Sequence, residues 1–142
     1  MPIVSSILTE TSLVLTLWYS RVTLSEWKEH LTNLLDDPMF DSTSLHLVDI
    51  RSADLSAIGQ AEIADIVRFL QPSRERISGR KLAILAGKEM PKANLAADLI
   101  GTLGISLATF VFSGTALKWL QLEAHAVEPH LSNMRRELPR TN

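Results

Sequence analysis

Acid–base chemistry in this sequence would depend on its four histidines, because histidine alone has an ordinary pKa near neutrality. His46 lies inside an apolar run of strand length, which predicts a satisfied sheet residue, and His30 falls on the polar side of an expected helix, which predicts a solvated one. The pairs Glu123–His125 and Glu128–His130 are spaced by two, whereas metal ligands on one helical face are spaced by three or four. We therefore expect no catalytic residues, no metal site and no cofactor.

The sequence lacks the motifs of common enzyme classes: it has no G-x-S-x-G, no glycine-rich phosphate loop and no H-E-x-x-H. It has no cysteine, which excludes thiol nucleophiles and disulfides and fits a reducing, cytoplasmic compartment. The net charge of −2 lacks the basic excess that nucleic acid requires, so we expect no nucleic-acid partner. These observations predict a protein that is not an enzyme.

Polar side chains that follow the expected parallel strands are better candidates for a binding site, because ligands of open α/β sheets sit beyond the carboxyl ends of the strands. The rim so predicted for a ligand or partner contains Asp49, Arg51, Ser52, Lys88 and Ser113. Arg51 and Lys88 could meet an anionic group there. The alternative is that Asp49 and Arg51 anchor the local loop and that Ser113 caps the last helix.

These positions depend on an alternation of strands and helices. Short apolar runs at residues 3–8 and 13–18 predict a hairpin, and later runs at 45–50, 81–86 and 105–112, separated by helical segments, predict parallel strands. The fold class is therefore α/β: a mixed sheet of about five strands, a hairpin followed by β-α-β units, with helices packed on it. The strand at 45–50 should be central, a capping box at Thr23 starts the first helix, and residues 73–80 should form a polar loop.

A heptad-like apolar stripe follows the last expected strand. Its members are Leu117, Leu120, Ala124, Val127, Leu131, Met134 and Leu138. Pro129 interrupts the stripe and predicts two helices, the second starting near the proline. The stripe either covers the domain's own core or forms an oligomer interface, through Val127, Leu131, Met134 and Leu138, as in a homodimer.

The length of 142 residues suits one domain. We expect an α/β domain over residues 1–120 and a helical extension over residues 121–142 that packs on the domain or on a partner. No apolar run reaches the roughly 20 residues needed to span a bilayer, so no transmembrane segment is expected.

The run from Leu47 to Asp54, followed by a helix and then by Arg80 to Leu85, resembles the bacterial STAS-like family related to the anti-sigma factor antagonists, in an uncharacterised branch. Phe110–Phe112, leading through Ala116 to Trp119 and Leu120, is similar to the way members of that family end. The resemblance follows the order of elements over residues 3–120. It implies a mixed sheet and a protein that binds partners or small molecules without catalysis.

Antagonists of this kind are switched by phosphorylation of a serine at the start of the helix after the central strand. The corresponding stretch here, residues 54–59, lacks the family's D-S-S-G signature, and Ser56 is the nearest hydroxyl and the candidate phosphosite. The resemblance thus implies a regulatory module that acts on a protein partner. The alternative is a carrier of a small apolar molecule or lipid, because related domains are similar in architecture to CRAL-TRIO proteins.

Aromatic side chains bear on these two alternatives. Trp18, Tyr19 and Trp27 either line a pocket or simply pack together, and Phe69, Phe110 and Phe112 are expected in the core. A carrier needs an enclosed apolar cavity, whereas a regulatory module can have a filled core and an exposed apolar patch.

Overall fold

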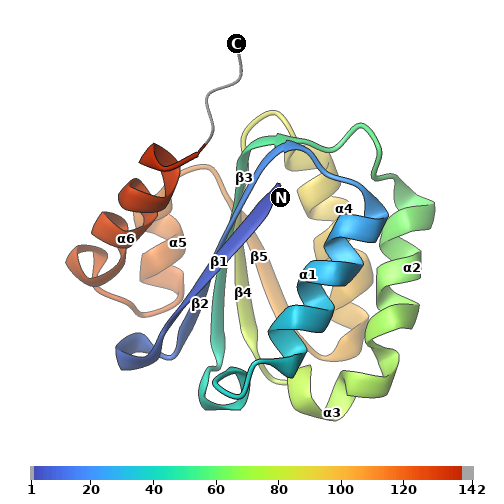
Figure 1. Cartoon of the computed structure of the whole chain (residues 1–142), viewed down its shortest axis with the longest axis horizontal. Helices are drawn as coiled ribbons and strands as arrows, with labels where there is room; N and C mark the ends of the chain where they lie inside the picture. The colour runs from blue at the N-terminus through green and yellow to red at the C-terminus, as the bar shows by residue number, and fades with distance from the viewer. Residues whose placement is uncertain (1, 139–142) are drawn as a thin grey trace.

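A five-stranded mixed sheet forms the centre of the molecule, in a computed structural model that describes residues 2–138 (Figure 1). The strands are β1 (Ile3–Leu8), β2 (Leu13–Arg21), β3 (Leu45–Asp54), β4 (Lys81–Leu85) and β5 (Ser106–Phe110). They lie in the order β1-β2-β3-β4-β5, with β1 antiparallel to β2 and the other neighbours parallel. The predicted hairpin, parallel units and central strand are confirmed.

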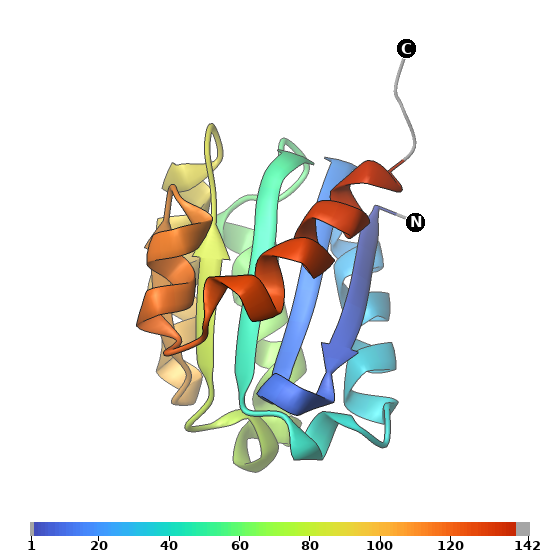
Figure 2. The ribbon, with the colours of Figure 1, turned by 90° about the vertical axis from the view of Figure 1, so that its left-hand side faces the viewer.

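Helices cover both faces of the sheet (Figures 1 and 2). One face carries α1 (Leu24–Asp36), α2 (Gln60–Leu70), α3 (Arg74–Ile77) and α4 (Met90–Ile100), and the other carries α5 (Ser113–Trp119) and α6 (Ala124–Arg136). Short 3-10 turns lie at Thr9–Thr11, Phe40–Ser42, Gln71–Ser73 and Gly101–Leu103. None of the helices in the described part of the chain has the length and apolar character needed to cross a membrane.

Strand β3 shows why two helix layers are needed. Its side chains alternate between the faces, so Leu47 enters the core under α5 and α6, while Ile50 enters the core under α1, α2 and α4. Both side chains are buried. A strand that is apolar on both sides must be covered on both sides, which explains its nearly continuous apolar sequence.

Local signals define several element ends. Thr23 Oγ1 accepts a hydrogen bond from the Glu26 N–H at 3.3 Å, and the Thr23 N–H donates to Glu26 Oε1 at 3.0 Å, which confirms the predicted capping box. Gly104 follows the last turn after α4 at φ 90°, and a Cβ there would lie 2.4 Å from Ser78 Oγ. Only glycine suits that position.

The segment after α2 differs from the prediction. Residues 73–80 were expected to be a polar loop, but the chain forms α3 there. Ile77 is 4% exposed and packs into the core under the helices, and this burial stabilises one helical turn in an otherwise polar stretch.

The C-terminal stripe folds into two helices, but their boundary is not near the proline. The chain turns at Gln121, which has φ 62°, and Pro129 lies inside α6. Val127 and Leu131 are 0% and 4% exposed in the core formed by the sheet and α5. This burial favours the alternative in which the stripe covers the domain's own core, and the assignment of Val127 and Leu131 to an oligomer interface stays a prediction.

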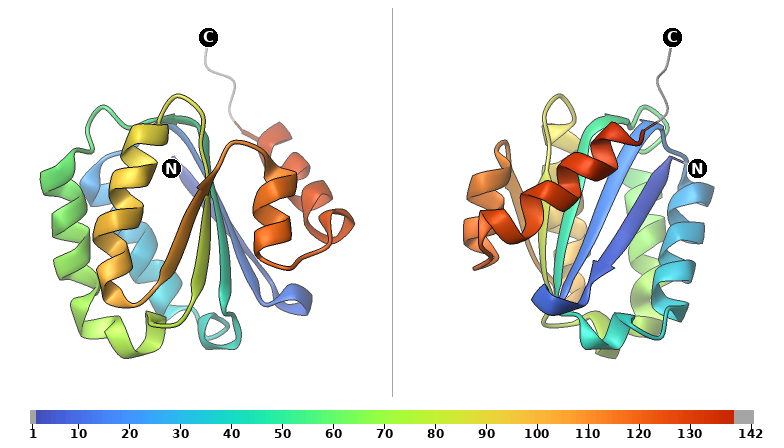
Figure 3. Two further views of the ribbon diagram at one scale, coloured as in Figure 1. Left: turned by 180° about the vertical axis from the view of Figure 1, so that it is seen from behind. Right: turned by 60° about the vertical axis from the view of Figure 1, so that its left-hand side comes forward.

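Figure 3 shows α6 crossing the sheet on the face opposite α1. Met134, partly buried, packs at the margin of the same core, and Leu138 is half-buried at the end of the described chain. The stripe therefore covers the domain's own core over most of its length. The division of the chain at residue 120 stays a prediction.

Two phenylalanines expected in the core are at the surface. Phe112 is 72% exposed and Phe69 is 36% exposed, whereas Phe110 packs on Trp119 with ring centroids 5.7 Å apart. Strand β5 ends at Phe110, so the alternation that buries Phe110 no longer directs Phe112 inward.

Candidate functional site

An apolar cavity lies between the sheet and the layer of α1, α2 and α4. Its volume is about 140 Å³, and its walls come from β2 to β5 and from all three helices. Val48, Ile50 and Ile84 form its floor on the sheet, and Leu31, Ile63 and Ala93 close it from the helices. An apolar cavity of about 150 Å³ takes up benzene, so this cavity can hold a small apolar molecule.

The aromatic pair of the N-terminal part lines this cavity. Trp18 on β2 and Trp27 on α1 meet edge to face, with ring centroids 5.2 Å apart and an interplanar angle of 73°. Both indoles are largely buried. The two expectations for these residues are therefore compatible: the rings pack against each other and also form the cavity wall.

A few polar side chains interrupt the apolar wall: Thr16, His30, His46, Arg80 and Lys92. Thr16 and His46 come from adjacent strands, because Val14 pairs with His46 and Thr16 pairs with Val48 in the β2–β3 register. Thr16 is 2% exposed and His46 is 8% exposed. Polar groups buried to this degree require hydrogen-bond partners or a polar ligand.

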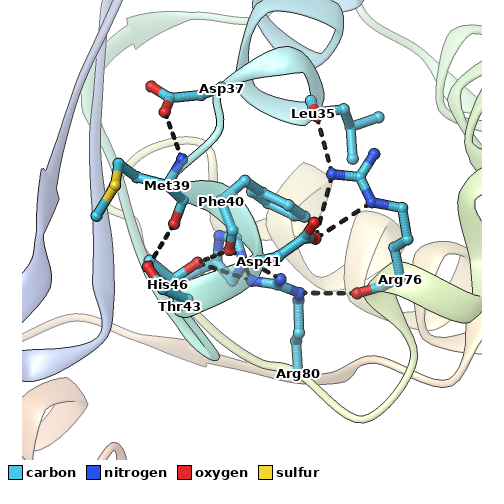
Figure 4. A network of polar contacts seen from close by, with 10 residues as sticks. Leu35, Asp37, Met39, Phe40, Asp41, Thr43, His46, Arg76 and Arg80 are labelled. Carbon is cyan, nitrogen blue, oxygen red and sulfur yellow. Dashed lines mark hydrogen bonds and ion pairs between the residues drawn. The ribbon is translucent and has the colours of Figure 1, made fainter.

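Arg80 is a buried arginine held by backbone and side-chain oxygens at this end of the cavity (Figure 4). Its Nε donates to the Arg76 carbonyl at 3.1 Å, its Nη1 to Thr43 Oγ1 at 2.9 Å and its Nη2 to the Phe40 carbonyl at 3.1 Å. Nη1 also lies 3.3 Å from His46 Nε2. The guanidinium stacks on the Phe40 ring, 3.8 Å from its centroid, which adds a cation–π contact.

The charge of Arg80 has no carboxylate partner in the described part of the chain. The nearby Asp41 forms its ion pair with Arg76, at 3.2 Å. Burial lowers the pKa of Arg80 from its ordinary value, while the charge of Asp41 raises it. A buried cation thus lies beside the cavity with neutral hydrogen-bond partners only.

Both histidines of the cavity are neutral at pH 7. Burial, followed by the charges of Arg80 and His30, lowers the pKa of His46 to about 3, and burial lowers the pKa of His30 to about 4. His30 was expected to be solvated, but it faces the space between α1 and the sheet, which corrects that expectation. His46 is buried in the sheet, as the sequence predicts, but its only side-chain hydrogen-bond partner within the described residues is Arg80, 3.3 Å from Nε2.

A second, more polar hollow of about 250 Å³ lies between β1 and α1. Ser5, Thr9, Asn33 and Asp37 contribute to its walls. It shares His30 and Leu34 with the apolar cavity. These two side chains separate the interior from the outer hollow.

The predicted rim residues Asp49 and Arg51 are in contact with each other, on the opposite face of the sheet. Asp49 is completely buried and accepts from Arg51 at Nε, 3.0 Å, and Nη2, 2.9 Å, as well as from its backbone N–H at 3.0 Å. Arg135 Nη1 donates to the same carboxylate at 2.8 Å. These bonds have an anchoring role, but they connect β3 to α6 and do not hold a local loop as that alternative expected.

Sequence reasoning missed Arg135. A signal was available, since Arg135 follows Leu131 by four residues and so lies on the helical face that carries the apolar stripe.

The other rim residues lie apart from this pair. Ser113 is the first residue of α5, and its Oγ donates to Glu128 Oε1 at 2.9 Å, so it connects α5 to α6 and does not cap the helix. Lys88 is exposed, and Ser52 is half-buried opposite Tyr19 in the sheet. Within the described residues, no hydrogen bond or ion pair connects Lys88 or Ser113 to Asp49, so the polar contacts do not bring the five side chains together.

Ser56 lies in the turn between β3 and α2. Its N–H donates to Asp54 Oδ1 at 2.9 Å, and this bond is the main cause that lowers the pKa of Asp54. The residue is exposed. Helix α2 begins at Gln60 after the cap residue Gly59, so Ser56 is not at the helix N-terminus.

Side chains at the start of α4 form hydrogen bonds with the turn between β3 and α2. Glu89 Oε2 accepts the Leu55 N–H at 2.5 Å, and Lys92 Nζ donates to the Leu55 carbonyl. Within residues 2–138, no group of three or more histidine, aspartate or glutamate side chains could hold a metal ion.

Comparisons with known proteins bear on the fold. No family model matches the sequence, and no curated protein matches it either. The structure is similar to the crystal structure of an uncharacterised protein of the DUF3478 family with a SpoIIAA-like fold from Shewanella loihica PV-4. The TM-score is 0.56 at 17% identity, over 83% of this chain and 93% of that one. The chain therefore has a SpoIIAA-like, STAS-like α/β fold, as the resemblance of its motifs implied.

Proposed function

We propose that this protein is a cytoplasmic, non-enzymatic STAS-like binding module whose ligand is a small apolar molecule held between the sheet and α1, α2 and α4. The observation that supports the proposal is the apolar cavity of about 140 Å³. A non-enzymatic role is supported by the two histidines in its walls, which are weak bases because their pKa values are lowered to about 4 and about 3, and by the contact of His46 with Arg80.

Energetics favour an occupied cavity. An empty apolar cavity of this size costs the folded state roughly 3 kcal/mol, which is a large fraction of the stability of a small domain. A ligand that fills the space recovers contacts with the walls and stabilises the folded state in proportion to its concentration.

The outer hollow between β1 and α1 is the access route that we propose for the ligand. His30 and Leu34 line both spaces, so a ligand that enters from this hollow would pass between these two side chains. Such a route suits a carrier, which must load and release its ligand.

Filling the cavity tests the proposal. Ala93→Leu places a larger side chain in the cavity, because Ala93 lines it from α4, and Ala97→Leu on the same helix, outside the cavity, is the matched control. Toluene should bind to the wild type and to the control and raise their Tm, but should not bind to Ala93→Leu. Equal Tm increases in all three proteins, or in none, would contradict the proposal. Native mass spectrometry of the purified protein checks for a retained ligand.

A second function, a regulatory module that binds a protein partner, is favoured by a different observation. Val111 and Phe112 are 55% and 72% exposed next to each other where β5, an edge strand, ends. Adjacent exposed apolar side chains at an open sheet edge are typical of interaction surfaces. A second copy of this chain is the partner that can be tested directly.

Sedimentation velocity over a range of concentrations tests this second function. Self-association that Phe112→Ser abolishes, and that Phe69→Ser preserves, would support a homodimer through the end of β5. A monomer at every concentration would exclude the homodimer.

A further inference from the structure

The cavity has one end at which hydrogen-bonding capacity is unused. Within the described residues, every fully enclosed side-chain nitrogen and oxygen atom has a hydrogen-bond partner. The Thr16 hydroxyl forms no hydrogen bond with another described residue, although Thr16 is only 2% exposed. It must therefore border open space, and the space that Thr16 lines is the apolar cavity.

His46 presents a donor to the same space. Arginine can only donate, so the His46 Nε2 atom that faces Arg80 at 3.3 Å must be the accepting nitrogen. In the neutral ring the proton then sits on Nδ1, which has no hydrogen-bond partner in the described chain and, by the same argument, borders the cavity. The contact with Arg80 thus determines the tautomer of His46 and leaves the N–H at Nδ1 as the donor that faces the cavity.

Arg80 gives this end of the cavity a positive character. The guanidinium lies behind His46, is 7% exposed and forms no ion pair within residues 2–138. Its field in a low-dielectric interior favours negative or partly negative atoms near His46. The imidazole N–H and the buried cation therefore favour an acceptor atom, and the Thr16 hydroxyl, which can donate or accept, can donate to the same atom.

We propose that the ligand of the cavity is an apolar molecule with one terminal oxygen acceptor, a carbonyl or carboxylate, which accepts hydrogen bonds from Thr16 Oγ1 and His46 Nδ1. The apolar part extends along Val48 and Ile50 toward Trp18 and Trp27. This inference rests on the proposed function and specifies the chemical class of its ligand. A purely apolar ligand would leave the two donors unpaired, which is unfavourable.

Three probes of similar size separate the possibilities: toluene has no acceptor, benzamide has a neutral carbonyl and benzoate has a carboxylate. Binding is followed by the indole N–H signals in NMR spectra, because Trp18 and Trp27 line the cavity while Trp119 lies on the other face of the sheet. The signals of Trp18 and Trp27 should shift on titration, and that of Trp119 should not. Benzamide or benzoate should bind more tightly than toluene, and the tighter of the two tells a carbonyl ligand from a carboxylate ligand.

Thr16→Val removes the hydroxyl and keeps the shape of the side chain. It should weaken benzamide and benzoate binding by about tenfold and leave toluene binding unchanged. Thr16→Ser retains the hydroxyl and should keep the preference. Thr109→Val is the control, because the Thr109 hydroxyl donates to Asn94 Oδ1 at 2.8 Å outside the cavity.

The outcomes distinguish this inference from the proposed function. If toluene binds as tightly as the acceptor probes, or if Thr16→Val affects all three probes equally, the acceptor end is wrong and the apolar carrier stands. If none of the probes shifts the signals of Trp18 and Trp27, both proposals fail.

Discussion

Asp49 in the middle of β3 accepts a hydrogen bond from Arg135 of α6 at 2.8 Å, across 86 positions of sequence. The carboxylate is completely enclosed, whereas the Arg135 side chain is 36% exposed. A buried carboxylate needs a full set of donors, and two arginines supply it here. The last helix is therefore connected to the sheet by a polar contact as well as by its apolar side.

The contact between Asp49 and Arg135 predicts that replacing each residue lowers the free energy of unfolding by a different amount. Arg135→Ala should lower the free energy of unfolding by about 1 kcal/mol, because Arg51 still pairs with the carboxylate and Arg135 is partly exposed. Asp49→Ala should cost about 2 kcal/mol, because it removes the shared acceptor of both arginines, whose side chains are 32% and 36% exposed and can be partly solvated after the loss. Urea unfolding measures both values. Equal costs would contradict the assignment of Asp49 as the shared acceptor.

The internal packing of α6 predicts that its apolar stripe is needed for folding. Leu131→Ala should destabilise the domain by roughly 3 kcal/mol, because Leu131 is 4% exposed in the core with α5. Met134→Ala, at the partly buried margin, should cost about 1 kcal/mol. Thermal unfolding at several protein concentrations measures the costs. A Tm that rises with concentration in the wild type and not in Leu131→Ala would indicate an oligomer interface instead.

The buried histidines predict lower stability in acid. Their pKa values fall from 6.5 in the unfolded chain to about 4 for His30 and about 3 for His46, so the unfolded chain binds more protons over this interval. The contribution of the two neutral histidines to the free energy of unfolding is therefore fully present above pH 6.5, and it is lost as the pH falls toward 4 for His30 and toward 3 for His46. Urea unfolding between pH 7 and pH 4 measures the slope. His30→Asn should flatten it, and an unchanged slope in this variant would show that His30 does not contribute.

The turn at Ser56 predicts the effect of a negative charge. Ser56 is exposed, and the Asp54 carboxylate already accepts its N–H at 2.9 Å, so a phosphate or an aspartate there adds repulsion in the β3–α2 turn. Ser56→Asp should lower Tm by a few degrees and should weaken self-association if the regulatory function holds. Ser73→Asp, in the turn after α2, is a charge-matched control. Identical sedimentation of the two variants would remove Ser56 from the candidate switch positions.

Several elements could be predicted from the sequence because their signals are local. The capping box at Thr23, the proline at the start of α4 and the glycine at position 104 are recognised by bonds or backbone angles within a few residues. The short helix α3 could not be predicted in this way. Its one apolar anchor, Ile77, becomes significant only when the core it enters exists.

The predicted rim shows the limit of local reasoning for sites. Asp49 and Arg51 follow each other on one strand, and their contact is a consequence of that spacing. Lys88 and Ser113 come from other connections, and strand order alone does not determine where their side chains point. A carrier with an apolar cavity was one of the two alternatives, but no local signal shows which polar side chains line that cavity.

The sequence by itself determined the order of the strands and of the longer helices between them, the mixed sheet and the absence of common catalytic motifs, because periodicity, caps and motifs are properties of neighbouring residues. Only the tertiary structure decided that Thr16, His46 and Arg80 lie at one end of an apolar cavity, since they belong to separate segments. It also decided that α6 covers its own sheet, because an apolar stripe is the same whether it faces its own core or a second copy.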